Sequence, residues 1–157
     1  MLKTTLLFIS LASFITAMAQ PQDSEREKQA IQYAIEEMAG AFGSSEIDRY
    51  LQYWTYPCAY QFDGGLSSFE NEEKFGSFIS SFRQSLPEKY SRSMIAGISI
   101  EIVDDTQAMA SVMWVRIVDG KPTENFGDVY TLVRKNGEWK VILAVAYGGE
   151  RLIALNK

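Results

Sequence analysis

The sequence contains no histidine and only one cysteine, Cys58, among its 157 residues. Without histidine, the protein cannot build a Ser-His-Asp or Cys-His nucleophile system, or a zinc or iron site with histidine ligands. A single cysteine cannot form an internal disulfide or a thiolate cluster around a metal. We therefore expect no metal site and no cofactor, and we expect the Cys58 thiol to be buried.

Positive charge is also scarce, because 15 Lys and Arg stand against 20 Asp and Glu, which gives a net charge of −5. Nucleic-acid binding requires clustered Lys and Arg to neutralise phosphates, so no nucleic-acid partner is expected. The chain has no basic amphipathic helix, so no membrane binding is expected once the N-terminal segment is removed. The hydrophobic fraction of 46% is ordinary for a globular protein, and the length corresponds to one domain.

Residues 1–19 have the features of a secretory signal peptide. Lys3 supplies a positive charge, residues 6–18 form an uncharged and mostly apolar run, and residues 17–19 give a small-x-small cleavage pattern. The run is shorter than the roughly 20 residues that a membrane-spanning helix needs. We predict that residues 1–19 are cleaved, that the protein is exported (periplasmic or secreted), and that residues 23–157 form one domain.

The spacing of apolar residues changes from helical to extended along this domain. It predicts a helix from a capping box at Ser24 to Gly43, a shorter helix capped by Ser45, and a third helix that ends before Pro87. Two short strands lie between the second and third helices. Four extended segments follow, at residues 93–103, 107–118, 124–134 and 139–147. Their connections are too short for parallel crossovers, so the fold class is α+β, with three helices packed on an antiparallel sheet.

The two-residue turn at 136–137 predicts how the last strands pair. Counting from this turn, Asp128 opposes Val145 on the last strand. The loop at residues 119–122, by the same counting, places Trp114 beside Asp128. Side chains alternate, and the larger, more aromatic face is expected to meet the helices. This face includes Met94, Ala96, Ile98, Trp114, Arg116, Phe126, Asp128, Tyr130, Leu143, Val145 and Tyr147. The outer face is apolar in its middle, which predicts a homodimer through that face unless surface residues or the chain terminus cover it.

Three segments together resemble a known family. They are Tyr53–Cys58 followed by Phe62-Asp63-Gly64-Gly65, the strand Ala110–Arg116, and the ending Tyr130–Val141. Their order and spacing resemble NTF2-like, SnoaL-like domains over nearly all of residues 23–157. The resemblance implies a cone, in which a strongly curved sheet wraps around helices and leaves a pocket at its open end. Members include isomerases, cyclases, dehydratases and binding domains, so the fold does not decide the function.

Two carboxylates are candidates for catalysis. Asp128 lies mid-strand on the expected inner face, where burial raises the pKa of a carboxyl and suits it to act as a general base. It either pairs with Arg116, diagonally across the hairpin, or contacts a ligand, and the two roles can coexist because a paired Arg116 can also hold an anion. Asp63 lies where ketosteroid-isomerase-like enzymes often place a base, although Asp-Gly-Gly is also typical of a tight turn.

Aromatic side chains are the candidates for ligand binding, although core packing also explains any one of them. Rings with polar tips suit an apolar ligand that carries a few polar groups. The predicted ligand-binding residues are Trp54, Tyr56, Trp114, Arg116, Tyr130 and Tyr147, and Tyr60 is a further aromatic residue that could line the pocket. Tyr33, which can be compared with the first-helix tyrosine of ketosteroid-isomerase-like enzymes, points roughly 190° away from the apolar stripe of its helix and is expected at the surface.

These features lead to three hypotheses of function. The first is an exported protein that binds a small, largely apolar ligand in the cone pocket. The second is a cofactor-free isomerase, cyclase or dehydratase with Asp128 or Asp63 as the base and a tyrosine as the donor. The third is a dimeric interaction module without a ligand. Because histidine is absent and Tyr33 points away from the core, the sequence favours binding over catalysis.

Overall fold

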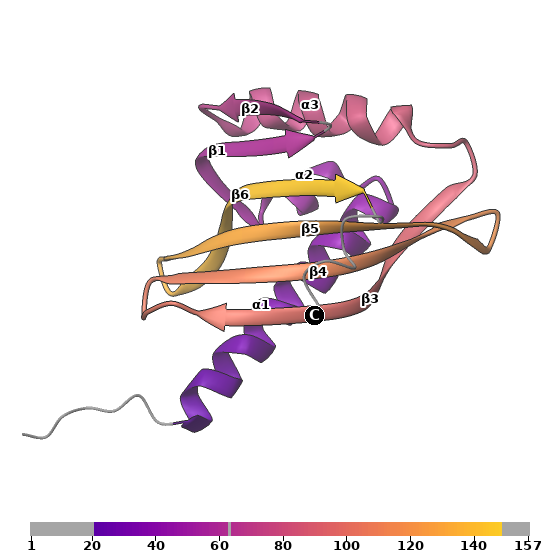
Figure 1. Cartoon of the computed structure of the whole chain (residues 1–157). Helices are drawn as coiled ribbons and strands as arrows, with labels where there is room; N and C mark the ends of the chain where they lie inside the picture. The colour runs from indigo at the N-terminus through magenta and orange to yellow at the C-terminus, as the bar shows by residue number, and fades with distance from the viewer. Residues whose placement is uncertain (1–20, 63, 149–157) are drawn as a thin grey trace, which may run out of the picture.

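The computed structural model describes residues 21–62 and 64–148 (Figure 1). Its elements follow the order α1 (Pro21–Gly43), α2 (Ile47–Leu51), β1 (Trp54–Phe62), β2 (Gly65–Phe69), α3 (Glu72–Ser85), β3 (Tyr90–Ile102), β4 (Gln107–Val118), β5 (Lys121–Lys135) and β6 (Glu138–Gly148). This order confirms the predicted α+β class. The predicted signal peptide and Asp63 lie outside the described residues.

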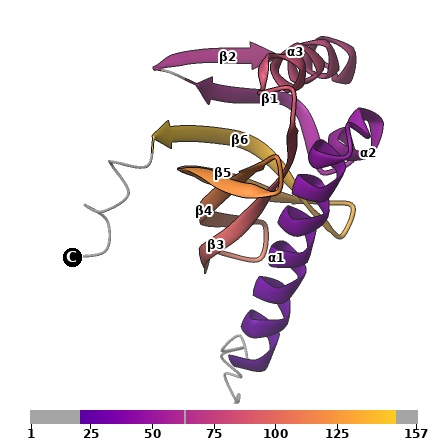
Figure 2. The ribbon, with the colours of Figure 1, turned by 90° about the vertical axis from the view of Figure 1, so that its right-hand side faces the viewer.

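All six strands form one sheet in the order β2-β1-β6-β5-β4-β3. Neighbouring strands are antiparallel except β1 and β6, which are parallel. Parallel neighbours need a long connection, and the chain from β2 to β5 supplies it. Figure 2 shows the sheet curving around α1, α2 and α3, which all lie on one side of it. The predicted cone is therefore confirmed.

The core lies between the helices and the inner face of the sheet. Ile31, Ile35 and Met38, spaced three or four residues apart on α1, are 0%, 1% and 2% exposed, and Phe75 and Ile79 on α3 are 0% and 1% exposed. Burying such side chains stabilises the fold by about 1.5–3 kcal/mol each. The sheet contributes Ala108, Ala110, Val112, Trp114, Tyr130, Leu132, Trp139, Val141 and Ala144 to the same cluster.

Arg83 on α3 completes the C-terminal end of α1. Its Nε donates to the carbonyl of Phe42 at 3.1 Å, and its Nη2 donates to the carbonyl of Gly43 at 3.1 Å. The last carbonyls of a helix lack intrahelical partners and carry partial negative charge, so a guanidinium suits them. The same group lies over the ring of Tyr90, 4.6 Å from its centroid. One side chain therefore joins α1, α3 and the start of β3.

The predicted faces of β6 are wrong beyond a β-bulge. The register shifts where Leu132 pairs with Val141 but Thr131 pairs with Leu143, so Asp128 opposes Ala146 rather than Val145. A bulge adds one residue to one strand and moves every later side chain to the other face. The residues that the structure places on the outer face, against the prediction, are Leu143, Val145 and Tyr147.

The pairing predicted for Trp114 is also wrong on both neighbouring strands, and on β3 a second register shift is the reason. The shift lies between Ile95 and Gly97, so Ile95 pairs with Trp114 and Met94, which is 47% exposed, lies outside the core. Ala96 falls within this shift and is exposed rather than directed at the helices. On β4, Val112 rather than Trp114 opposes Asp128.

Two smaller expectations about the helices are also corrected. Helix α1 already includes Pro21, three residues before the predicted start. Ser45 does not cap α2, because it has a positive φ of 63° and the N-cap residue is Glu46. No helix within the described ranges is both long and apolar enough to cross a membrane.

Glu27 ties the first half of α1 to the β5–β6 hairpin. Its Oε2 accepts a hydrogen bond from Trp139 Nε1 at 2.7 Å and forms an ion pair with Arg134. We expect Glu27→Ala to lower the free energy of unfolding by about 2 kcal/mol, because hydrogen bonds to charged groups contribute about 1.5–3 kcal/mol. Urea unfolding followed by tryptophan fluorescence measures this loss.

Glu25→Ala is the matched control, because it removes only an exposed ion pair with Lys28. It should change the free energy of unfolding by less than about 0.5 kcal/mol. Equal losses in the two variants would show that the Glu27 contacts do not stabilise the fold.

Candidate functional site

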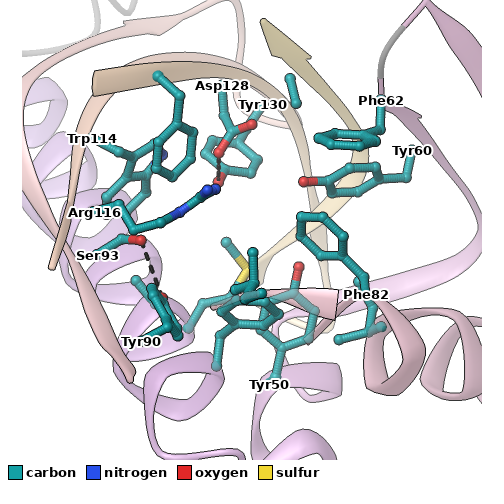
Figure 3. Close-up of a pocket in the computed structure, with 17 residues that line it drawn as sticks. Tyr50, Tyr60, Phe62, Phe82, Tyr90, Ser93, Trp114, Arg116, Asp128 and Tyr130 are labelled. Atoms are coloured by element: carbon teal, nitrogen blue, oxygen red, sulfur yellow. Dashed lines mark hydrogen bonds between the residues drawn. The ribbon is translucent and has the colours of Figure 1, made fainter. Parts of the chain in front are cut away.

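A small cavity lies between the sheet and the helices, at the end of the sheet where β1 and β6 finish (Figure 3). Its volume is about 70 Å³. An apolar cavity of about 150 Å³ holds one benzene molecule, so this cavity has room for only a few heavy atoms. The lining residues are Met38, Ala39, Phe42, Tyr50, Tyr60, Phe62, Ile79, Phe82, Leu86, Tyr90, Ser93, Trp114, Arg116, Phe126, Asp128, Tyr130 and Ala146.

A wider hollow of about 790 Å³, which we call the vestibule, adjoins the cavity. The two share Phe62, Phe82, Leu86, Arg116, Phe126 and Ala146. The vestibule also includes Gln61, Gly64, Ser85, Pro87, Glu124, Val145, Tyr147 and Gly148. A molecule larger than the cavity can therefore extend from it into the vestibule past this shared rim.

Asp128 is a buried acid in the cavity wall and is only 4% exposed. The hydroxyl of Tyr130 donates to its Oδ2 at 2.9 Å, and its Oδ1 has no hydrogen-bond partner among the described residues. Burial raises the pKa of Asp128 to about 6, although Tyr130, the Trp114 indole and the charge of Arg116 act to lower it. A carboxyl with this pKa gains and loses a proton near neutral pH.

Arg116 does not form the ion pair with Asp128 that the sequence allowed. Its Nη1 pairs with Glu124 Oε2 at 2.5 Å, and the register places these two residues directly opposite each other on β4 and β5. Its guanidinium carbon lies 4.9 Å from the ring centroid of Phe126. Its Nε is buried without a hydrogen-bond partner in the described structure. Arg116 therefore acts on Asp128 only through its charge.

Three tyrosines surround Asp128 with phenol groups. Figure 3 shows the hydroxyls of Tyr50 and Tyr60 turned toward the middle of the cavity, across from Asp128 and Tyr130. Burial raises the pKa of all three tyrosines well above the usual range, and the nearby charge of Asp128 raises it further. The phenols consequently stay protonated and are available as hydrogen-bond donors.

Residues 24–149 match the family described as NTF2-like protein (DUF6841). The chain belongs to this NTF2-like family. A protein of unknown function from Mycobacterium tuberculosis shares its fold, with 14% sequence identity and a TM-score of 0.71 over 84% of this chain and 77% of that chain. No curated protein matches the sequence.

Two similar structures come from Novosphingobium aromaticivorans. One is provisionally named a scytalone dehydratase, with 12% identity and a TM-score of 0.66 over 82% of this chain and 88% of that one. The other is provisionally named an aromatic ring hydroxylase, with 17% identity and a TM-score of 0.67 over 80% of this chain and 90% of that one. At such identities the similarity shows the NTF2-like fold alone.

The structure brings together half of the ligand-binding residues predicted for this NTF2-like chain. Trp114, Arg116 and Tyr130 line the cavity. Trp54 and Tyr56 line a separate groove beside the start of α1 and the β5–β6 hairpin. Tyr147, the remaining predicted residue, lines only the vestibule. The bulge turns its side chain outward, where its hydroxyl lies 3.4 Å from the hydroxyl of Ser111.

Other sequence expectations about individual residues have clear outcomes. Tyr33 is 63% exposed, as expected. Cys58 is buried as expected, and burial raises the pKa of its thiol to about 12. Tyr50 and Tyr90 were not among the candidates, because their helical and strand positions resemble ordinary core positions. Their hydroxyl groups could have indicated a role in the cavity, since a buried phenol requires a polar neighbour.

The raised pKa of Asp128 links folding stability to pH. Its folded pKa of about 6 exceeds the usual 3.8, so the folded chain binds this proton more tightly than the unfolded chain. The resulting stabilisation is fully present below the unfolded pKa and is lost as the pH rises through the folded pKa. We expect the stability of Asp128→Asn relative to wild type to increase by about 2–3 kcal/mol between about pH 4 and pH 8.

Urea unfolding of both proteins across this pH range measures the difference. Any constant effect of the new amide cancels, because only the change with pH is compared. Parallel stability curves for the two proteins would contradict the raised pKa.

Proposed function

We propose that this protein binds a small, largely apolar molecule in the cavity, with the polar end of the molecule near Asp128. The observation that carries the proposal is a buried carboxyl with one oxygen unpartnered, in a cavity walled mainly by aromatic and aliphatic side chains. A buried polar atom without a partner costs about 1–3 kcal/mol. A bound molecule that hydrogen-bonds with this oxygen, as a donor or, when Asp128 is protonated, as an acceptor, would recover that free energy.

The walls supply the apolar part of the recognition. Trp114 and Phe126 stack with their ring centroids 6.4 Å apart, and Phe62 meets Phe82 edge to face at 5.1 Å across the rim. Such rings offer large apolar surfaces at little loss of conformational entropy. A few polar groups among apolar walls are typical of small-molecule sites.

The binding proposal is tested with single-ring compounds that carry an alcohol, a ketone or a carboxylate. We expect at least one to shift the Trp114 indole N–H signal in nitrogen-15 NMR spectra of the full chain. Ala146→Phe should weaken that binding at least about tenfold, because Ala146 lies on the rim and the new ring fills the passage. Ala96→Phe, on the exposed part of β3, is the matched control. Saturable binding that survives Ala146→Phe would contradict this site.

A cofactor-free isomerase, cyclase or dehydratase is the second candidate function. The observation in its favour is that Asp128 forms no ion pair and has a pKa of about 6, which suits a general base near neutral pH. Tyr50 and Tyr60 are placed to donate hydrogen bonds to an oxygen that gains negative charge. The neighbour provisionally named a scytalone dehydratase shares this fold. Asp63, the other candidate base, lies outside the described residues.

Proton exchange next to a carbonyl tests this second function. In deuterated water, wild type should catalyse deuterium incorporation at the carbon beside the carbonyl of a ring ketone, with a rate that rises through about pH 6 as Asp128 loses its proton. Asp128→Asn should lower the rate at least about 100-fold. Exchange no faster than in buffer, for every ketone shown to bind, would exclude proton abstraction and leave a binding function.

Export and dimerisation complete the proposal. The N-terminal sequence pattern supports cleavage and export to the periplasm or the medium. The apolar outer face of the sheet, with Met109 45% exposed, supports a homodimer through that face. The third hypothesis, an interaction module without a ligand, is less favoured because the cavity contains a buried carboxyl oxygen without a partner.

A further inference from the structure

We propose that Arg116 determines the ligand specificity of the cavity, and that the ligand is an apolar carboxylate whose anionic group replaces Glu124 on the guanidinium. This inference rests on the proposed binding function and names the class of molecule that the site takes. Among the described residues that line the cavity and the vestibule, Arg116 is the only one with a positive charge. It belongs to both spaces and so lies at the threshold between them.

The present partner of Arg116 is one that a ligand can displace. The side chain of Glu124 is 51% exposed, whereas that of Arg116 is only 16% exposed. Ion pairs with a solvent-exposed partner contribute little stability, since water solvates the carboxylate almost as well. Glu124 can therefore turn into solvent at small cost when another anion arrives.

The guanidinium also has an unused donor on its inner side. Arg116 Nε is buried and has no partner in the described structure, while Nη1 already holds Glu124. The ring of Phe126 lies 4.9 Å from the guanidinium carbon and fixes its position. A carboxylate has two oxygens and can accept from two guanidinium N–H groups at once, which a neutral alcohol cannot do.

The rest of the cavity is richer in donors than in acceptors. Trp114 Nε1 is a second buried donor that forms no hydrogen bond in the described structure, although the indole lies close enough to Asp128 to lower the pKa of that carboxyl. The phenols of Tyr50 and Tyr60 point into the same space. Asp128 is the one carboxylate that could repel an anion from inside, and it can take up a proton when a second negative charge approaches. Because the cavity holds only a few heavy atoms, the carboxylate would lie between Arg116 and Asp128, and the apolar body would extend past the rim into the vestibule.

The test compares 4-phenylbutyrate with 4-phenylbutan-1-ol, which have the same apolar body. Binding to the full chain is measured by the Trp114 indole N–H signal in nitrogen-15 NMR spectra. We expect the carboxylate to bind at least about tenfold more tightly than the alcohol. Arg116→Gln should abolish this preference, and Glu124→Gln should strengthen carboxylate binding about threefold while leaving alcohol binding unchanged.

The opposite effects of the two variants separate recognition from a structural role. If the ion pair only supported the fold, removing either partner would weaken binding of both probes alike. Arg92→Gln, the same change at an exposed position on β3, is the control and should alter neither affinity. An alcohol that binds as tightly as the carboxylate, or a preference that survives Arg116→Gln, would overturn this inference while the binding function stands. If neither probe nor any other ring compound shifts the signal, the binding function itself fails.

Discussion

In the part of the chain that the structure describes, the fold depends on covering one face of a six-stranded sheet with three helices. A flat sheet of this width would leave part of its apolar face exposed to water. The sheet instead curves around α1, α2 and α3, so that a single core collects side chains from all layers (Figure 2). Curvature narrows the space at one end and leaves the other end open. The cavity lies where the helices no longer fill the concave side of the sheet.

The bulge between β5 and β6 decides what occupies that open end. Without the extra residue, Leu143 and Val145 would point inward beside Tyr130 and Asp128. With it, the inward positions belong to Ala144 and Ala146, whose side chains are much smaller. The space that larger side chains would have filled is part of the cavity. A change of register by one residue therefore leaves a cavity where larger side chains would have filled the core.

Much of this architecture could be predicted from the sequence. Helical and alternating patterns located all three helices and the four-strand meander, and the turn at 136–137 fixed the pairing next to it. The bulges could not be predicted, because an extra residue leaves the local alternation of apolar side chains almost unchanged. The wrong side assigned to Tyr147 follows directly from this. The position of Ser45 could not be predicted, because a residue type that favours helix caps also occurs with a positive φ in tight connections.

The candidate site could be predicted only at a polar residue that the sequence places among apolar neighbours. Asp128 stood out because an acid between aromatic residues on an inner face is costly to bury. The ion-pair partner of Arg116 could not be predicted, because it depends on the register between β4 and β5. Glu124 lies directly opposite Arg116 on the neighbouring strand, whereas Asp128 lies opposite Val112, four residues away from Arg116 on β4. Tyr50 was missed because α2 and β1 come together with β5 only in the folded chain.

The charge arrangement at this end of the cone explains how a buried acid is tolerated without an ion pair. Asp128 receives a hydrogen bond from Tyr130 and an attractive charge from Arg116, yet its pKa is still raised to about 6, so the unfavourable effect of burial outweighs both. A direct ion pair would lower that pKa and fix the carboxylate in one charged state. Because Glu124 holds Arg116 at the threshold, Asp128 keeps a titratable proton inside an apolar space. The same separation leaves Arg116 at the boundary that the cavity shares with the vestibule. Under the proposed function, ligand recognition depends mainly on Arg116 and control of the buried proton mainly on Asp128, and the charge of Arg116 couples the two.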